Sequence, residues 1–421
     1  MKTLKVVLIG AGNRGQSYTE QMTDDRFNVV AVAEPVPELR NYIKEKHNVS
    51  DDMCFSSWEP LLDMPKFADV VVIATMDRLH YAPAMKAIEK GYDILLEKPV
   101  SPDFTECVEI ANAAKEKGVK ILVCHVLRYT PFFGKIKEMI DTGKLGRVMS
   151  IHHAECVGNV HQSHSFVRGN WGNSDRSSSM ILQKCCHDMD IMQWIVGKPC
   201  KNVQSFGSLT YFTEENAPKG APEYCDKSCP EYDRCPYNAV KLYVEDEENL
   251  WFREVAAEKK VPTNREVAEA LKNTQYGKCV YKCDNNVVDH QVVNLEFEDG
   301  TVASFNMCAF NRGGRFIRIM GTEGEIYGNA ETNMIEYYSF KTKEKTVIDA
   351  SDEAATGGHG GGDGGIVNNL YAYVANKYDG VQLSEIDISV KNHLIAFAAE
   401  KSRVEERIIN IKEFEQELGL K

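Results

Sequence analysis

The first 125 residues alternate short apolar runs with amphipathic stretches in a regular order. The runs are rich in Val, Ile and Leu and have the length expected of buried parallel strands: 5–8, 29–33, 70–74, 94–96 and 120–124. Between them, apolar residues recur at helical spacing, as Ala84, Ala87 and Ile88 do before Gly91 ends a predicted helix over 81–90. This alternation predicts a doubly wound parallel sheet.

After Arg128 the pattern changes, and we expect a second domain. A helix is predicted over 177–196, and longer strands of antiparallel type are predicted over 147–157, 292–297, 301–307 and 315–320. Residues 298–300 carry a hairpin pattern, and two further helices are predicted over 366–377 and 390–404. The domains are therefore expected at 1–125 and 126–421.

Two segments interrupt the second domain. Residues 214–283 form a polar, cysteine-containing stretch, and residues 356–365 read TGGHGGGDGG, which is typical of a loop. Both are expected to lie as additions around the mouth of a site.

Composition and charge narrow the classes of protein. The chain has 421 residues, 43% of them hydrophobic, and 49 basic against 62 acidic side chains give a net charge of −13. This excess of acid argues against nucleic acid as a partner. The apolar run at 6–11 is far shorter than the roughly 20 residues that span a membrane, so no membrane partner is expected. Thirteen cysteines, most of them isolated in apolar segments, favour reduced thiols and a cytoplasmic location.

A glycine pattern directly follows the first predicted strand. Gly10, Gly12 and Gly15 stand in G-A-G-N-R-G, together with Asn13 and Arg14. The first glycine suits a tight turn, the second lets backbone approach a pyrophosphate, and the third permits close helix packing. Glu34 ends the second strand, where a carboxylate can accept both ribose hydroxyls and would repel the 2′-phosphate of NADP. We therefore expect NAD as the cofactor.

Further motifs accompany this turn. Leu96-Glu97-Lys98-Pro99 ends the fifth strand, and the others are Ala74-Thr75 with His80, Arg128-Tyr129, His187-x-x-Asp190 and a late A-A-E-K-S-R stretch at 398–403. With these motifs the chain resembles the Gfo/Idh/MocA family of sugar and inositol dehydrogenases over nearly its whole length. The resemblance implies a Rossmann domain followed by an α/β domain with an open, mostly antiparallel sheet, and substrate held between them.

The resemblance also implies roles for particular residues. Lys98 would contact the cofactor and the reacting hydroxyl. Cofactor contacts are expected at the glycine turn and Glu34, and at Thr75, Met76, His80 and Glu97. Substrate contacts are expected at Arg128, Trp171, Asp190 and His359; a tryptophan face suits the apolar side of a sugar ring, and His359 could close over the site on its glycine-rich loop.

The helix predicted over 177–196 carries an acid/base stripe. Lys184, His187 and Asp188 are spaced i, i+3, i+4, so a cation, an imidazole and a carboxylate share one face. Oxidising a secondary alcohol requires loss of the hydroxyl proton, which an imidazole accepts near neutral pH. We expect His187 to be the base, with Lys98 and Lys184 as catalytic ammonium groups. A structural histidine is the alternative.

One position departs from the family. Its sugar dehydrogenases often carry an aspartate four residues before the histidine, where this chain has Gln183. An NAD-dependent glycoside hydrolase, which oxidises, eliminates and returns the hydride, is therefore the alternative to an NAD-dependent carbohydrate or polyol dehydrogenase. A sensor that binds NAD without catalysis is a third. The sugar and the carbon that is oxidised stay open.

The insertion also carries a cysteine pattern. Cys225, Cys229 and Cys235 precede Cys279 and Cys283 by about forty residues. Four thiolates can close a tetrahedral zinc site, but the spacing is not the usual C-x2-C, and free or disulfide-bonded cysteines are the alternative. No ligand set follows from the sequence. An antiparallel sheet with a free face also predicts a homo-oligomer, either a dimer or a tetramer.

Overall fold

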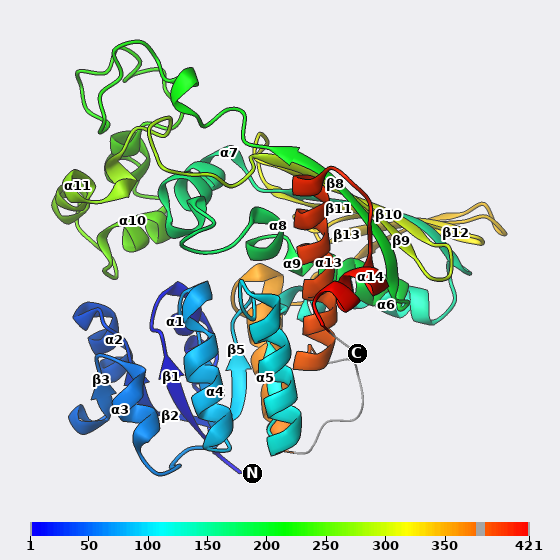
Figure 1. The fold of residues 1–421 in the computed structure, drawn as a ribbon, viewed down its shortest axis with the longest axis horizontal. Helices are drawn as coiled ribbons and strands as arrows, with labels where there is room; N and C mark the ends of the chain where they lie inside the picture. Colours follow the sequence, from blue (N-terminus) through cyan, green and yellow to red (C-terminus); the bar gives the residue numbers. More distant parts are fainter. Residues whose placement is uncertain (1, 376–383, 420–421) are drawn as a thin grey trace.

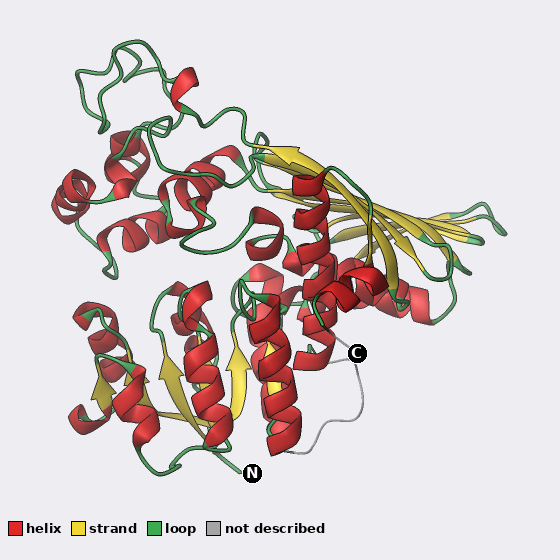
Figure 2. Ribbon diagram, in the orientation of Figure 1, coloured by secondary structure: helices red, strands yellow, loops and turns green. Residues whose placement is uncertain are grey.

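Two β-sheets organise the chain, one in each half of the molecule (Figures 1 and 2). The computed structural model describes residues 2–375 and 384–419. The first sheet is wholly parallel, in the order β3-β2-β1-β4-β5-β6. Its strands are β1 (Leu4–Ile9), β2 (Phe27–Ala33), β3 (Cys54–Phe55), β4 (Val70–Ile73), β5 (Asp93–Leu96) and β6 (Ile121–Val123). The predicted Rossmann topology is confirmed.

Helices alternate with these strands, as the periodicity predicts: α1 (Asn13–Glu20), α2 (Pro37–His47), α3 (Trp58–Asp63), α4 (Tyr81–Glu89) and α5 (Phe104–Lys117). The strand order reverses at β1, which lies between β2 and β4. In sheets of this kind ligands bind outside the carboxyl ends of the strands at that point. Gly10 and Thr75 follow the two strands that meet there.

The second sheet has nine strands in the order β14-β13-β12-β11-β7-β10-β9-β8-β15. Every neighbouring pair is antiparallel except β7 with β10, so the mostly antiparallel sheet is confirmed. The strands are β7 (Val148–Cys156), β8 (Cys200–Ser208), β9 (His290–Phe297), β10 (Val302–Cys308), β11 (Gly314–Gly321), β12 (Gly324–Asn329), β13 (Met334–Ser339), β14 (Lys345–Asp349) and β15 (Ile409–Asn410).

Helices cover one face of this sheet (Figure 2). They are α6 (Pro131–Asp141), α9 (Cys186–Val196), α13 (Ile386–Glu405) and α14 (Ile411–Glu417). Burial alternates along β9 and β10, so their other face is open. Within the described part of the chain, no helix combines the length and apolar character needed to cross a membrane.

The prediction of one continuous helix over 177–196 is wrong, because the structure has two helices there. α8 (Met180–Gln183) ends before Lys184, and α9 begins at Cys186. Cys185 has a ψ of 4°, outside regular helical geometry, so side chains before and after it do not share one stripe. This break decides how the site is built.

A late helix, α12 (Gly362–Val374), returns to the first domain. Its Ile366, Val367 and Leu370 pack in the same core as Leu4 and Leu8 of β1. The glycine-rich loop predicted over 356–365 therefore ends sooner than expected. A Cβ at Gly362 would lie 2.4 Å from the carbonyl oxygen of Val126, so only glycine permits this close packing. Residues 376 and 377 of the predicted helix lie outside the described residues.

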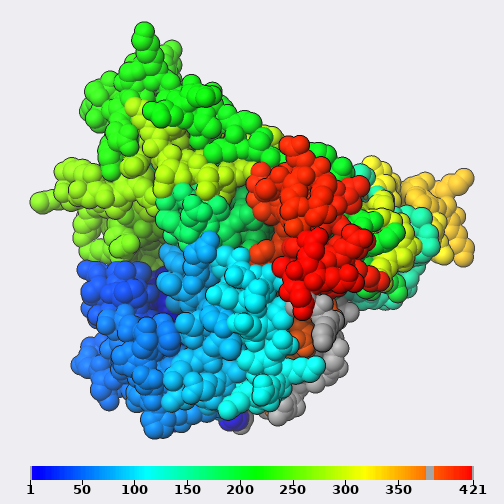
Figure 3. Space-filling view, in the orientation of Figure 1, coloured from blue at the N-terminus to red at the C-terminus, as the bar shows by residue number. Residues whose placement is uncertain are grey.

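The insertion at 214–283 contains α10 (Leu250–Ala257) and α11 (Asn264–Asn273) and two small cores of its own. The single turn α7 (Asn159–His161) packs against one of these cores through Val160. The space-filling view shows these residues, in green and yellow-green, above the blue first domain and at the opposite end of the second domain from the orange strands (Figure 3).

Candidate active site

The glycine turn has the geometry that its sequence predicts. Gly10 has a φ of +88°, and a Cβ there would lie 2.6 Å from the carbonyl oxygen of Ala74. A Cβ at Gly15 would lie 2.0 Å from the carbonyl oxygen of Gly10, so α1 packs closely on β1. Around Gly12, at the N-cap of α1, no atom lies within 4 Å of an added Cβ. The start of α1 is thus open to an anion.

Glu34 lies beside this turn. Its buried carboxylate accepts hydrogen bonds from the backbone N–H of Ala11 at 2.7 Å and of Val36 at 2.9 Å. Both oxygens are therefore fixed at the carboxyl end of β2. Arg40, which could have offset the negative charge, donates instead to the carbonyl oxygen of Glu34.

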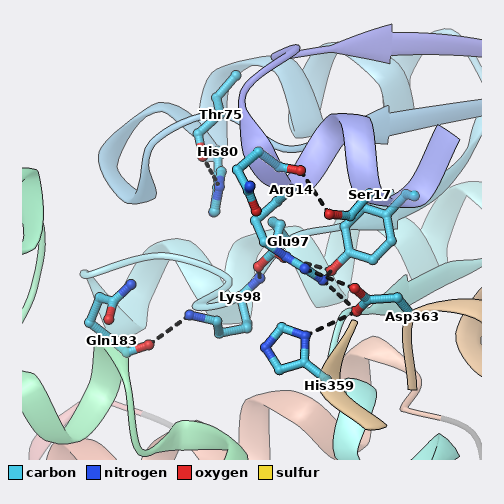
Figure 4. Close-up of polar contacts among 11 residues, drawn as sticks. Arg14, Ser17, Thr75, His80, Glu97, Lys98, Gln183, His359 and Asp363 are labelled. Carbon is cyan, nitrogen blue, oxygen red and sulfur yellow. Dashed lines mark hydrogen bonds and ion pairs between the residues drawn. The ribbon is translucent and has the colours of Figure 1, made fainter. Parts of the chain in front are cut away.

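Arg14 and Glu97, both predicted near the cofactor, contact each other (Figure 4). Arg14 donates from Nε to Glu97 Oε1 at 2.9 Å, and from its two terminal nitrogens to Asp363 at 3.0 and 2.7 Å. Tyr18 donates to the same Glu97 oxygen at 2.6 Å. Burial opposes ionisation of Glu97, but Arg14 and Lys98 outweigh it and lower the pKa of this carboxyl. The network joins α1, β5 and α12, the last of these through Asp363.

Lys98 reaches across to the second domain. Its Nζ donates to the carbonyl oxygen of Gln183, at the end of α8, at 2.8 Å (Figure 4). A helix end carries partial negative charge on its carbonyl oxygens, which suits an ammonium group. The break between α8 and α9 thus gives Lys98 its acceptor. The amide oxygen Oε1 of Gln183 is buried without a hydrogen-bond partner among the described residues.

His187 is buried at the start of α9, with 4% of its surface exposed. Its Nδ1 has no hydrogen-bond partner within the described residues. Burial lowers the pKa of His187 well below its ordinary value, and the nearby Lys98 lowers it further. Its ring centroid lies 6.0 Å from that of His359 and 5.9 Å from that of His125. Burial and the nearby Lys98 therefore favour the neutral imidazole, the form that can accept a proton.

The predicted stripe of Lys184, His187 and Asp188 along one helix face is wrong, because Lys184 and Asp188 are linked through Glu155 and Arg315 of the second sheet. Lys184 Nζ lies 3.4 Å from Glu155, before the helix break. Asp188, after it, accepts from Arg315 Nε at 2.9 Å and lies 2.8 Å from His153 Nε2. Although burial opposes it, Arg315 and His153 hold the pKa of Asp188 at about 2.

The sequence analysis missed Glu155, His153 and Arg315. A signal was present, because His153 and Glu155 are two residues apart on β7 and so share a face. Polar side chains on the covered face of a strand are unusual, and here they meet Asp188 and Lys184. Arg315 lies on the neighbouring β11, directly opposite Glu155.

Arg128 and Asp190 bind each other. Arg128 donates from Nε and a terminal nitrogen to the two carboxylate oxygens of Asp190 at 2.6 and 2.8 Å, and both side chains are buried. Asn392 of α13 donates to Asp190 as well. The pair fixes α9 against the segment that enters the second domain. A direct substrate contact by either residue stays a prediction.

The remaining predicted residues lie around the junction of the two domains. His80 is buried, with Nδ1 2.8 Å from the carbonyl oxygen of Pro99 and Nε2 3.1 Å from that of Thr75, so it bridges the loops after β4 and β5. Met76 is half exposed beside it. Trp171 donates from Nε1 to Asp77 at 3.3 Å, across the domain junction.

His359 lies at the other side of Lys98, in the glycine-rich segment before α12 (Figure 4). It has a φ of +53°, and its Nδ1 lies 3.2 Å from Asp363. About a third of its side chain is exposed. The structure thus brings together Lys98, His187 and His359 at the edge of the parallel sheet, close to the Arg14 network.

All thirteen cysteines are free thiols. In the described residues, the side chains as they stand offer no group of three or more His, Cys, Asp or Glu that could hold a metal ion.

Comparison with known proteins matches both halves of the chain. The model of an oxidoreductase family with an NAD-binding Rossmann fold matches residues 4–125, and the model of an oxidoreductase family's C-terminal alpha/beta domain matches residues 137–388. A Bacillus subtilis (strain 168) protein named as an oxidoreductase, YteT, is 26% identical over 72% of this chain and 72% of its own length.

Two further similarities concern proteins with named activities. A 2,7-anhydro-N-acetylneuraminate hydratase of Mediterraneibacter gnavus is 26% identical, over 47% of this chain and 50% of the hydratase. The solved structure of a levoglucosan dehydrogenase in complex with NADH and L-sorbose superimposes with a TM-score of 0.72 at 19% identity, covering 98% of this chain and 99% of that one. The latter likeness shows the fold.

Proposed function

Because the chain belongs to the Gfo/Idh/MocA family of NAD-binding oxidoreductases, we propose that it transfers a hydride from a secondary hydroxyl of a sugar, polyol or related carbohydrate to the nicotinamide of NAD. One observation carries this proposal. Lys98, from the carboxyl edge of the Rossmann sheet, donates to the carbonyl oxygen of Gln183, four residues before the neutral, buried His187. An ammonium group and a proton acceptor thus share the edge at which the nicotinamide would bind.

The first domain fits NAD. The open space at Gly12 leaves the start of α1 accessible to a pyrophosphate, and Glu34 is fixed where a ribose would lie. Bound NAD supplies the hydride acceptor. A carboxylate at Glu34 disfavours a 2′-phosphate, and Arg40, turned to backbone, does not neutralise it. These contacts favour NAD over NADP.

The chain's own residues handle the proton. His187 accepts the hydroxyl proton, because its lowered pKa keeps the imidazole neutral at physiological pH. The Lys98 ammonium stabilises the developing alkoxide, as a preorganised donor does in a water-poor site. Lys184, held by Glu155, contributes positive charge nearby. Arg128 and Asp190 hold α9 and therefore position His187, and we assign Trp171 and His359 to the substrate side.

A transient oxidation that ends in elimination and addition of water is the second candidate. The similarity to a hydratase favours it, as does Gln183 at the position where an aspartate is usual. Both reactions use the same proton acceptor and the same ammonium group. They differ in whether the hydride leaves with the cofactor or returns to the sugar.

One experiment separates the two. The purified protein is incubated with NAD and a panel of polyols, free sugars and aryl glycosides, and NADH absorbance and aglycone release are followed in parallel. NADH formed one-for-one with oxidised sugar, without aglycone, supports the dehydrogenase. Aglycone released without net NADH supports the hydrolase, and neither signal with any substrate contradicts both.

We further propose that the protein acts on a small molecule, as a homo-oligomer, in the cytoplasm. The charge of −13 and the open face of the second sheet support these proposals.

A further inference from the structure

Four cysteines from two separate segments line one small cavity in the insertion: Cys225, Cys229, Cys235 and Cys279. The cavity has a volume of about 20 Å³. Because roughly 10–15 Å³ suffices for one water-sized sphere, this volume suits a single ion. The aromatic rings of Tyr237 and Tyr281 contribute to its wall.

Backbone pairing holds two of these cysteines together. Tyr224 and Lys278 form an isolated antiparallel bridge. Side chains alternate along paired strands, so the next residues, Cys225 and Cys279, both lie on the face opposite to that pair. Two thiols from positions more than fifty residues apart in the sequence are thereby directed to the same side.

Beside the cavity lies a buried cation for which the described part of the chain supplies no anionic partner. Arg168 is wholly buried, and it donates to the carbonyl oxygens of Lys278 at 2.8 Å and Tyr237 at 2.6 Å. Its third contact is Cys225 Sγ at 3.8 Å, and one terminal nitrogen has no partner. Among the described residues no carboxylate pairs with Arg168, although a buried charge without a counter-charge is costly.

We propose that Cys225, Cys229, Cys235 and Cys279 bind one metal ion through four thiolates, with Zn²⁺ as the ion that four thiolates favour. Four thiolates and one Zn²⁺ carry a net charge of −2, which supplies the anion that Arg168 lacks. Binding releases four thiol protons. In their present rotamers the thiols do not surround an ion, so binding turns them into the cavity. The centre ties residues 225–235 to residue 279 and stabilises an insertion whose own core is small.

Metal analysis of the full-length protein, purified under reducing conditions without added chelator, tests this proposal. We expect about one zinc per chain, because a tetrahedral site of four thiolates holds one ion. Equal iron and sulfide with visible absorbance would contradict the single-ion site. The metal should be lost in Cys225→Ser and Cys279→Ser. It should remain in Cys283→Ser, because Cys283 does not line the cavity and its Sγ donates to the carbonyl oxygen of Cys279 at 3.4 Å.

A second measurement avoids dependence on variants that could fail to fold. The unmodified protein is alkylated with iodoacetamide before and after treatment with a strong chelator, and each cysteine is followed by peptide mass spectrometry. Partly exposed Cys225, Cys229 and Cys235 should be protected until the chelator is added. Folded protein that holds no zinc, or whose three thiols react equally fast with and without the chelator, would overturn the proposal.

Discussion

Individual side chains decide the chemistry at the edge of the parallel sheet. The glycine turn could be predicted in full, because the spacing of its glycines is set by close contacts between neighbouring backbone segments. The positions of Lys98 and His187 near one another could also be inferred from their motifs, while their catalytic roles stay predictions. The partners of Lys184 and Asp188 could not, because Glu155 and Arg315 come from β7 and β11 and meet the helix only through tertiary packing. Sequence spacing along one helix contains no information on those contacts.

Replacement of Lys98 should affect turnover more than cofactor binding. We expect Lys98→Ala to lower kcat by about 10²–10³-fold, equivalent to roughly 2.7–4 kcal/mol, because it removes a donor to developing negative charge. NAD affinity, measured by fluorescence titration, should change little. Lys90→Ala, which removes a lysine that contacts only the backbone of residues 63 and 64, is the matched control. Near-normal turnover of Lys98→Ala would remove its catalytic role.

The acid limb of the pH–rate profile should lie lower than for an ordinary histidine. The pKa of His187 is lowered, so the imidazole stays neutral and able to accept a proton until the pH falls well below about 6.5. Activity should therefore persist at pH 6 and decline only in more acidic buffer, and His187→Ala should lose both activity and this limb. A profile of kcat/KM against pH that falls by half at pH 6.5 or above would contradict the assignment.

Glu34 should set the choice between the two dinucleotides. Glu34→Gln keeps the shape of the side chain and its acceptor oxygen but removes the charge that opposes a 2′-phosphate. We expect the preference for NAD over NADP to narrow by about tenfold, or roughly 1.4 kcal/mol. Parallel titrations of both dinucleotides measure this preference. Equal affinities in the unmodified protein would disprove the role of Glu34.

At the scale of elements, Gly15 allows α1 to pack on β1, whereas Gly12 leaves room for a cofactor. A matched pair of variants distinguishes these two roles. Gly15→Ala places a Cβ 2.0 Å from the carbonyl oxygen of Gly10, so α1 must move away from β1 and thermal stability should fall. Gly12→Ala meets no atom within 4 Å, so Tm should hold while NAD affinity drops, because the methyl group occupies the pyrophosphate's approach. Calorimetry and NAD titration of both variants give the two readouts. Equal loss of Tm in both would refute the distinction.

The break between α8 and α9 could not be predicted, although five strands of the parallel sheet and four of the second sheet could. Apolar residues at 180–182 and at most positions of 191–196 flank the polar stretch between them, which is compatible with one continuous buried helix. The interruption at Lys184 and Cys185 turns a carbonyl oxygen toward Lys98 and sends Asp188 toward Arg315. Such a break is stabilised by partners outside the segment, and periodicity within the segment does not report them.

At the scale of the whole molecule, the open face of the second sheet predicts assembly. Phe206, Val302 and Tyr327 of three of its strands are each about half exposed on the uncovered face. Burying such a surface against a second copy would remove apolar area from water. We expect sedimentation at micromolar concentration to give a dimer or tetramer, and Phe206→Glu to shift it toward monomer. Glu248→Lys, at an exposed position in the insertion, is a control for surface charge change. A monomeric unmodified protein would contradict this prediction.

The return of α12 to the first domain has a consequence for biosynthesis. The nascent chain presents β1 and its apolar neighbours long before residues 362–374 have been translated, and those residues supply Ile366 and Leu370 to the same core. β6 likewise waits for residue 385, with which Leu122 forms an isolated bridge. The Rossmann unit is thus translated first but is among the last parts of the protein to complete its fold. Until residues 362–385 are translated, its exposed apolar surface is open to contacts with other proteins.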